Sequence, residues 1–145
     1  MKTEPDTIKL LRECDAGIKM GITSIDEVME YIKNDNFRKI LLTYKDEHVK
    51  LENEIQDFLN TCHDDGKNPS PMAKSMSWMK INAKLVMNES DQTIADLITD
   101  GCNMGVKSLN RYLNQYQASN EKSKDITKRI IKLEENFAME MRKFL

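Results

Sequence analysis

Apolar residues recur at alternating steps of four and three through the first half of the chain, which is the spacing of one face of an α-helix. The first stripe consists of Leu11, Asp15, Ile18, Ile22, Ile25, Met29 and Ile32. The second consists of Phe37, Leu41, Tyr44, His48, Leu51, Ile55, Phe58 and Cys62. Residues 34–36 (Asn-Asp-Asn) separate the stripes and favour a turn, because their side chains compete for backbone hydrogen bonds. The pattern therefore predicts a helical hairpin over about 1–65.

The ends of this hairpin also carry recognisable signals. Asp6 follows Pro5 and is expected to cap the first helix, since a carboxylate can accept the free N–H groups of a first turn. Gly66 is expected to end the second helix in a left-handed conformation. His63 lies near the same helix end, where a cationic side chain complements the helix dipole.

The second half of the chain repeats the pattern of the first. Its stripes consist of Ala95, Thr99, Cys102, Val106, Leu109, Leu113 and Tyr116, then Ile126, Ile130, Leu133, Phe137 and Phe144. Residues 103–113 (NMGVKSLNRYL) resemble residues 19–29 (KMGITSIDEVM), 84 positions earlier. Residues 132–141 (KLEENFAMEM) likewise resemble residues 50–59 (KLENEIQDFL). We interpret residues of about 90–145 as a second copy of the hairpin.

Four glycines fall at matched positions of the repeat, namely Gly17, Gly21, Gly101 and Gly105. Within each copy they are four residues apart, so they share a helix face. Small residues at these positions are expected to let two helices approach each other closely.

A further helix is predicted between the hairpins, over about 71–88. Ser70 and Pro71 suit its first turn, as N-cap and first helical residue. One of its faces carries Met72, Met76, Met79, Ala83 and Val86, while Trp78, Ile81 and Leu85 lie off that face. Because it is apolar on more than one side, we expect it to pack on the bundle and also on a second copy of the chain. The surface around Trp78 is thus the expected homodimer interface.

The chain is expected to form one all-α domain over 1–145. It has 145 residues with only five glycines and three prolines, and strand-like alternation is scarce. Two amphipathic hairpins bury their apolar stripes against each other as an antiparallel four-helix bundle.

The order of hairpin, long connection and hairpin resembles the ferritin-like superfamily. The chain is most similar to a bacterial four-helix-bundle branch of unknown function, which has an additional helix with a central Trp between its second and third main helices. PMAKSMSWMKINAKLVM, with Trp78, occupies that place here. The resemblance implies a ferritin-like bundle and raises the question of a di-metal site.

The usual di-metal ligand pattern is absent from the sequence. Such sites use a Glu on two helices and a Glu-x-x-His on each of the other two. Lys45 stands three residues before His48, and Asn60 stands three residues before His63. We therefore expect no cofactor and lean against an enzyme.

Two other metal sites are conceivable from the residue types. Asp15, Glu54 and Glu140 would form an acidic layer suited to iron or manganese, unless they are simply paired or exposed carboxylates. His48 is a weaker candidate ligand, because a hydrogen-bonded core histidine is the commoner case. Met72, Met76 and Met79 would suit Cu(I), unless they only fill the core.

Charge and cysteine usage narrow the possible partners. The formal net charge is −2 with both signs interspersed, so nucleic acid is not expected as a partner. The N-terminal segment is charged, and no apolar run is long enough to span a membrane. Three widely spaced cysteines suit a reducing, cytoplasmic compartment. The sequence thus favours a non-catalytic binding or structural protein with an unidentified protein partner. The alternative is a metal-binding protein.

Overall fold

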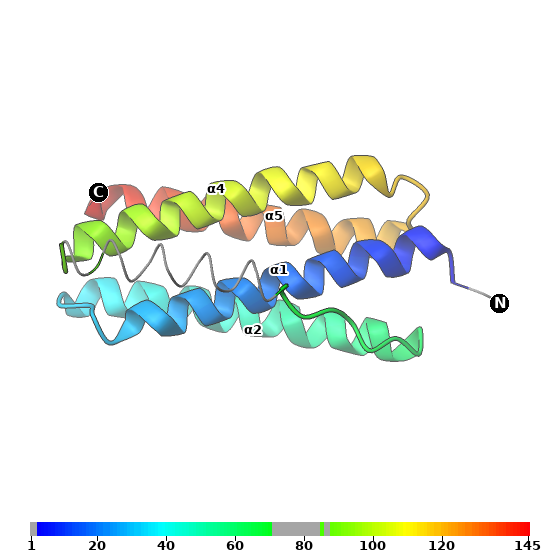
Figure 1. Ribbon diagram of the computed structural model, residues 1–145, viewed down its shortest axis with the longest axis horizontal. Coiled ribbons are helices and arrows are strands. Elements are labelled where there is room, and N and C mark those ends of the chain that lie inside the picture. The colour runs from blue at the N-terminus through cyan, green and yellow to red at the C-terminus, as the bar shows by residue number, and fades with distance from the viewer. Residues whose placement is uncertain (1–2, 71–84, 86–87) are drawn as a thin grey trace.

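Four long helices make up most of the computed structural model, which describes residues 3–70, 85 and 88–145. Within these residues there is no β-strand. The elements are α1 (Pro5–Met29), α2 (Asp35–Thr61), α4 (Asp91–Gln115), α5 (Glu121–Met141) and a final 3-10 turn, η1 (Arg142–Phe144). The prediction of an all-α four-helix bundle is confirmed (Figure 1).

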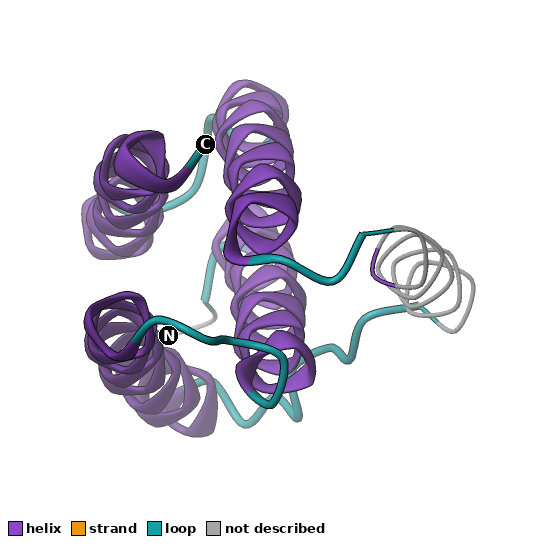
Figure 2. Ribbon diagram, turned by 90° about the vertical axis from the view of Figure 1, so that its left-hand side faces the viewer, coloured by secondary structure: helices purple, strands orange, loops and turns teal. Residues whose placement is uncertain are grey.

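The helices are arranged as two antiparallel hairpins joined by one long connection. The backbone N–H groups of Lys33 and Asn34, just after α1, both donate to Asp91 at the start of α4, at 2.9 Å each. At the opposite end, the N–H of Asn120 donates to Thr7 near the start of α1, at 2.8 Å. The end of α1 therefore lies beside the start of α4, and α2 and α4 run in the same direction. Figure 2 looks along the helices and shows them grouped around one axis.

The connection between the hairpins is described only in part. The predicted helix over about 71–88 lies outside the described residues except for residues 85 and 88, and Leu85 is buried in the core. Met72, Met76, Met79 and Trp78 also lie outside them. The connecting helix, the methionine site and the dimer interface all remain predictions.

Three of the helices begin at side-chain caps. Asn34, Ser90 and Asn120 stand before α2, α4 and α5, and each accepts a hydrogen bond from the backbone N–H three residues later. These contacts satisfy donors that a helix start leaves free. They lie at the polar breaks that the sequence pattern marked.

The start of α1 differs from the prediction. Pro5 already occupies the first helical position, so the cap position falls on Glu4, whose side chain makes no cap bond. Asp6 is inside the helix, where its carboxylate accepts the N–H of Ala118 at 3.1 Å. The prediction that Asp6 caps α1 is wrong, and Asp6 instead ties α1 to the turn before α5.

The end of α2 is also three residues earlier than predicted. His63, with φ of 55°, takes the left-handed position that ends α2, so the prediction that Gly66 ends this helix is wrong, although Gly66 does have the expected left-handed conformation, with φ of 80°. The N–H of His63 bonds to the carbonyl of Asn60, and the N–H of Asp64 bonds to that of Leu59, at 3.1 and 3.0 Å. This is the usual double closure of a helix C-terminus, here with a non-glycine residue at its centre. The chain then turns back toward α1, where Arg12 binds the carboxylate of Asp64.

The apolar core forms two clusters, one toward each end of the bundle. Leu11, Ile18 and Ile25 of the predicted first stripe are buried, whereas Ile22 and Met29 are only half-buried. Cys14 and Val28 are buried in addition, because each helix of a bundle contacts two neighbours and needs a wider apolar face than one stripe. None of the helices in the described residues is both long and apolar enough to cross a membrane.

Candidate functional site

A layer of four residues, one from each helix, separates the two apolar clusters. This central layer consists of Gly21 on α1, His48 on α2, Gly105 on α4 and Glu134 on α5. A Cβ placed at Gly21 would lie 3.2 Å from Cδ2 of His48, and one at Gly105 would lie 3.8 Å from Cγ of Glu134. The two glycines occupy matched positions of the repeat, but only Gly21 packs tightly against the polar pair, because a Cβ at Gly105 would make an ordinary contact.

The other two repeated glycines do not have the predicted role. Among the described residues, no atom lies within 4 Å of a Cβ placed at Gly17 or Gly101. The close approach expected at all four glycines is therefore limited to Gly21, and it is an approach to the side chain of His48 rather than to another backbone.

His48 bridges α2 and α5 with both of its ring nitrogens engaged. Its side chain is 1% exposed, Nδ1 lies 2.6 Å from the carbonyl oxygen of Tyr44, and Nε2 lies 2.5 Å from Oε1 of Glu134. A carbonyl and a carboxylate can only accept, so both nitrogens suit a protonated imidazolium. Burial lowers the pKa of His48, but the hydrogen bond and charge of Glu134 outweigh it, and the pKa lies above its ordinary value. The pair is therefore a buried ion pair.

The buried thiols are poor nucleophiles. Burial raises the pKa of Cys102, and the neighbouring charge of Glu134 raises it further. Burial also raises the pKa of Cys14 to about 12, although Thr127, 3.2 Å from its sulfur, acts in the opposite direction. A thiolate is the reactive form of cysteine, and neither side chain supplies it near neutral pH.

A second polar cluster surrounds Asp15, which is fully buried. Oδ1 of Asp15 accepts from Nε2 of Gln56 at 2.8 Å. Oδ2 accepts from Nζ of Lys19 at 2.9 Å and from the backbone N–H of Lys67 at 2.8 Å. Asp15 thereby links α1 to α2 and to the segment after α2, residues 64–70, which we call the strap.

Glu52 is the fourth side chain of this cluster and lies against Asp15. Burial, and then the hydrogen bond and charge of Asp15, raise the pKa of Glu52 to about 7. Its Oε1 accepts from Gln56 at 3.0 Å, whereas Oε2 is buried and accepts from no donor among the described residues. A proton on Oε2 directed at Asp15 satisfies both carboxyl groups, because an ionised pair offers only acceptors.

The predicted acidic layer of Asp15, Glu54 and Glu140 does not come together. Glu54 is exposed and forms a two-point contact with Arg129 of α5, which lowers the pKa of Glu54. Glu140 pairs with Lys143 at 3.1 Å. It stands eleven residues beyond Arg129, so it lies about 16 Å further along α5 at the usual rise of a helix. The three carboxylates are held by separate basic partners.

Sequence reasoning missed Glu52 and Glu134, although one signal points to both. Each is the Glu of a repeated Lys-Leu-Glu, at residues 50–52 and 132–134. In each half of the chain this Glu joins a buried polar pair, with Asp15 or with His48. The repeat therefore marks the two polar clusters as well as the apolar stripes.

The predicted metal ligands of the described chain are engaged in other contacts. Asp15 and His48 bond within the bundle, and across residues 3–70, 85 and 88–145 no three His, Cys, Asp or Glu side chains converge as a metal-binding group. The two polar clusters are thus the candidate sites. No protein-family model matches the chain, and no curated protein or solved structure matches it either.

Proposed function

We propose that this protein is a ferritin-like four-helix-bundle protein of the cytoplasm with a binding or structural role rather than a catalytic one. The helix order supports the first part. Helices α2 and α4 run in the same direction and are joined by one long connection, which is an arrangement that ferritin-like bundles use. Three free cysteines, two of them buried, suit a reducing compartment.

The proposal of a non-catalytic role rests on the hydrogen bonds that His48 and Asp15 make within the chain. Both nitrogens of His48 and both oxygens of Asp15 are hydrogen-bonded within the chain. These bonds join α2 to α5 and α1 to α2, so they fix how the helices pack. A group that acts on a substrate or holds an ion needs an available donor or acceptor. The polar atoms of His48 and Asp15 already have hydrogen-bond partners within the chain.

Metal content tests this proposal directly. Untagged protein, purified without chelators, is analysed by elemental mass spectrometry, alongside Asp15→Asn, His48→Gln and the matched surface variant Glu47→Gln. We expect no metal at a fixed ratio to the chain in any of the four proteins. Stoichiometric iron or manganese that is lost only in Asp15→Asn or His48→Gln would overturn the proposal. Copper that is lost in Met76→Leu would assign the metal to the segment between the hairpins.

The binding role is proposed to include a second copy of the chain, through the surface around Trp78. Analytical ultracentrifugation over a wide concentration range measures this, with Trp78→Ala compared with Met104→Ala, a change at an exposed residue of α4. We expect a dimer that Trp78→Ala alone weakens. A monomer at all concentrations would contradict the dimer and would leave a different protein as the partner.

A further inference from the structure

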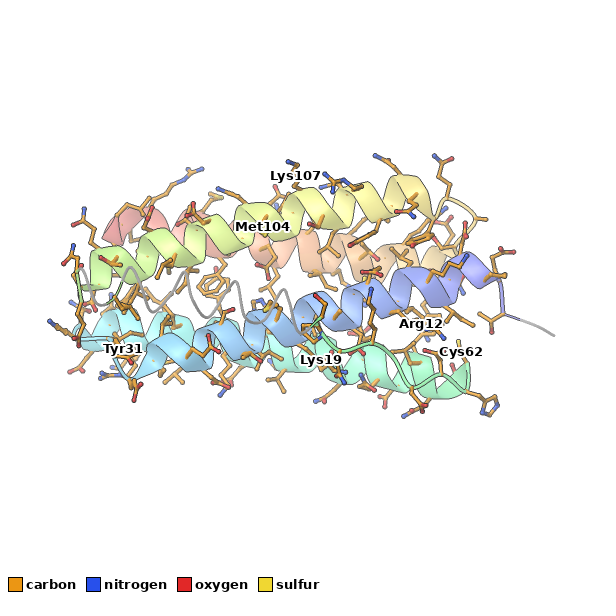
Figure 3. All side chains as sticks on the ribbon, viewed as in Figure 1. Arg12, Lys19, Tyr31, Cys62, Met104 and Lys107 are labelled. Carbon is orange, nitrogen blue, oxygen red and sulfur yellow. The ribbon has the colours of Figure 1, made fainter. Side chains whose placement is uncertain are left out.

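The strap is tied to the α1–α2 hairpin by four contacts along one side of α1. Arg12 binds the carboxylate of Asp64, and Glu13 binds Nζ of Lys67 at 2.6 Å. Two further contacts involve the buried cluster, because Asp15 accepts the N–H of Lys67 and Lys19 donates to Oδ1 of Asn68 at 3.2 Å. Figure 3 shows Arg12 and Lys19 along α1 beside the strap.

The backbone of the strap lies directly on the Asp15 carboxylate. Gly66 has φ of 80°, and a Cβ there would collide with Oδ2 of Asp15. Only a glycine combines this conformation with so close an approach. The backbone of the strap is therefore held in close contact with the carboxylate beneath it.

The charge beneath the strap is balanced only while Glu52 holds a proton. Among the described residues, the groups facing Glu52 are Asp15 and Lys19 of α1 and Gln56 of its own helix. Asp15 in turn contacts the strap through Lys67, whose ammonium is paired with Glu13 and faces Tyr112 and Tyr116 of α4. With Glu52 neutral, the negative Asp15 is matched by the positive Lys19. Loss of the proton adds a second negative charge, so that the two facing carboxylates share the donors of Gln56 and Lys19 with no proton between them.

We propose that Asp15 and Glu52 form a proton-operated clasp, which holds the strap on α1 and α2 while Glu52 is protonated and loosens it when that proton passes to solvent. Ionised Glu52 repels Asp15 and attracts Lys19, the residue that also binds Asn68 of the strap. The two strap contacts that depend on the buried cluster are thereby weakened together. The Arg12–Asp64 and Glu13–Lys67 pairs do not involve Glu52, so the side chains of Asp64 and Lys67 keep the strap anchored to α1.

The expected size of the pH effect follows from the difference in the pKa of Glu52 between the closed and the open strap. The pKa of Glu52 is raised from 4.5 to about 7 in the closed strap. If the open strap restores the ordinary value, the opening equilibrium rises about tenfold between about pH 6 and 8. This range covers conditions that a cell experiences, so the clasp would make the strap sensitive to physiological pH.

Nuclear magnetic resonance of the intact protein tests the clasp. The exchange rate of the Lys67 amide is measured across this pH range and divided by the intrinsic rate for an open chain. We expect the protection of this amide to fall about tenfold in the wild type. The same change is expected in Glu47→Gln, because Glu47 is an exposed residue of α2 paired with Lys50.

Glu52→Gln separates the clasp from general loosening of the fold. The side-chain amide introduced by this substitution can still donate to Asp15 but cannot ionise. The protection of the Lys67 backbone amide should therefore be nearly constant with pH. Constant protection in the wild type, or an equal fall in Glu52→Gln, would overturn the proposal. The carboxyl carbon signal of Glu52 in the wild type gives a second test, since a midpoint near 4.5 would also refute the clasp.

Discussion

The buried pair of His48 and Glu134 should be strongly coupled in a double-mutant cycle. His48 is 1% exposed and Glu134 is 14% exposed, so neither charge is well solvated if its partner is removed. Replacing one partner of a buried pair typically costs 3–5 kcal/mol. For His48→Leu and Glu134→Met we expect about 3 kcal/mol each, the lower end, because Glu134 retains some contact with water.

The double variant His48→Leu/Glu134→Met should cost no more than one of the single variants. It leaves no charge stranded, and the two apolar side chains occupy similar volumes between the two core clusters. Cys102 loses the carboxylate that it faces, so some destabilisation remains. The coupling energy is then about 3 kcal/mol, at the upper end for residues in contact.

Urea unfolding followed by far-ultraviolet circular dichroism measures all four proteins, at about pH 6, where the raised pKa of His48 keeps it charged. The exposed pair Glu47 and Lys50 supplies the matched cycle, and its coupling should be below about 0.5 kcal/mol. Effects of His48→Leu and Glu134→Met that simply add, to within about 0.5 kcal/mol, would refute a stabilising ion pair between α2 and α5 at this position.

Three further predictions concern pH and the turn after α2. The free energy of unfolding, measured by urea titration, should fall by about 2 kcal/mol from about pH 5 to 8. The reason is that Glu52 and His48 have higher pKa values in the folded protein than in the unfolded chain. The stability that they contribute is fully present below the unfolded pKa values and is lost as the pH rises through the folded pKa values. Glu52→Gln should flatten the lower part of this fall. His63→Gly should raise the free energy of unfolding by about 0.5–1 kcal/mol, measured as a higher melting temperature, because φ of 55° strains a residue with a side chain. Gly66→Ala should lower it by at least about 1 kcal/mol, and an unchanged melting temperature would show that the strap does not press on Asp15.

The level of each residue along the bundle could be predicted from the sequence, but its direction around the helix could not. A hairpin turning near residues 34–35 places His48 opposite Ile22, and the structure places it against Gly21. The same turn places Asp15 near Glu54 or Ile55, and its partner is Gln56. The helix length and turn set this register, and both are local properties of the chain.

The direction of a carboxylate around its helix depends on which neighbour the helix turns it toward. Glu52 and Glu54 are two residues apart, so they point to different sides of α2, one to Asp15 of α1 and the other to Arg129 of α5. Which of these two glutamates faces Asp15 and which faces Arg129 is determined by how the two hairpins pack. The Lys-Leu-Glu repeat marks both Glu52 and Glu134 and is visible without the structure, although the sequence analysis did not draw on it for these residues.

Both polar clusters balance a buried carboxylate with a proton held by the chain itself. Di-metal bundles balance their inward carboxylates with metal ions. Here the imidazolium of His48 faces Glu134, and the protonated carboxyl of Glu52 faces Asp15, so each cluster loses its balance when a proton leaves. The two clusters therefore respond to the same variable in the same direction, one at the centre of the bundle and the other beneath the strap. The packing of this bundle should therefore respond to pH, where that of a di-metal bundle responds to metal supply.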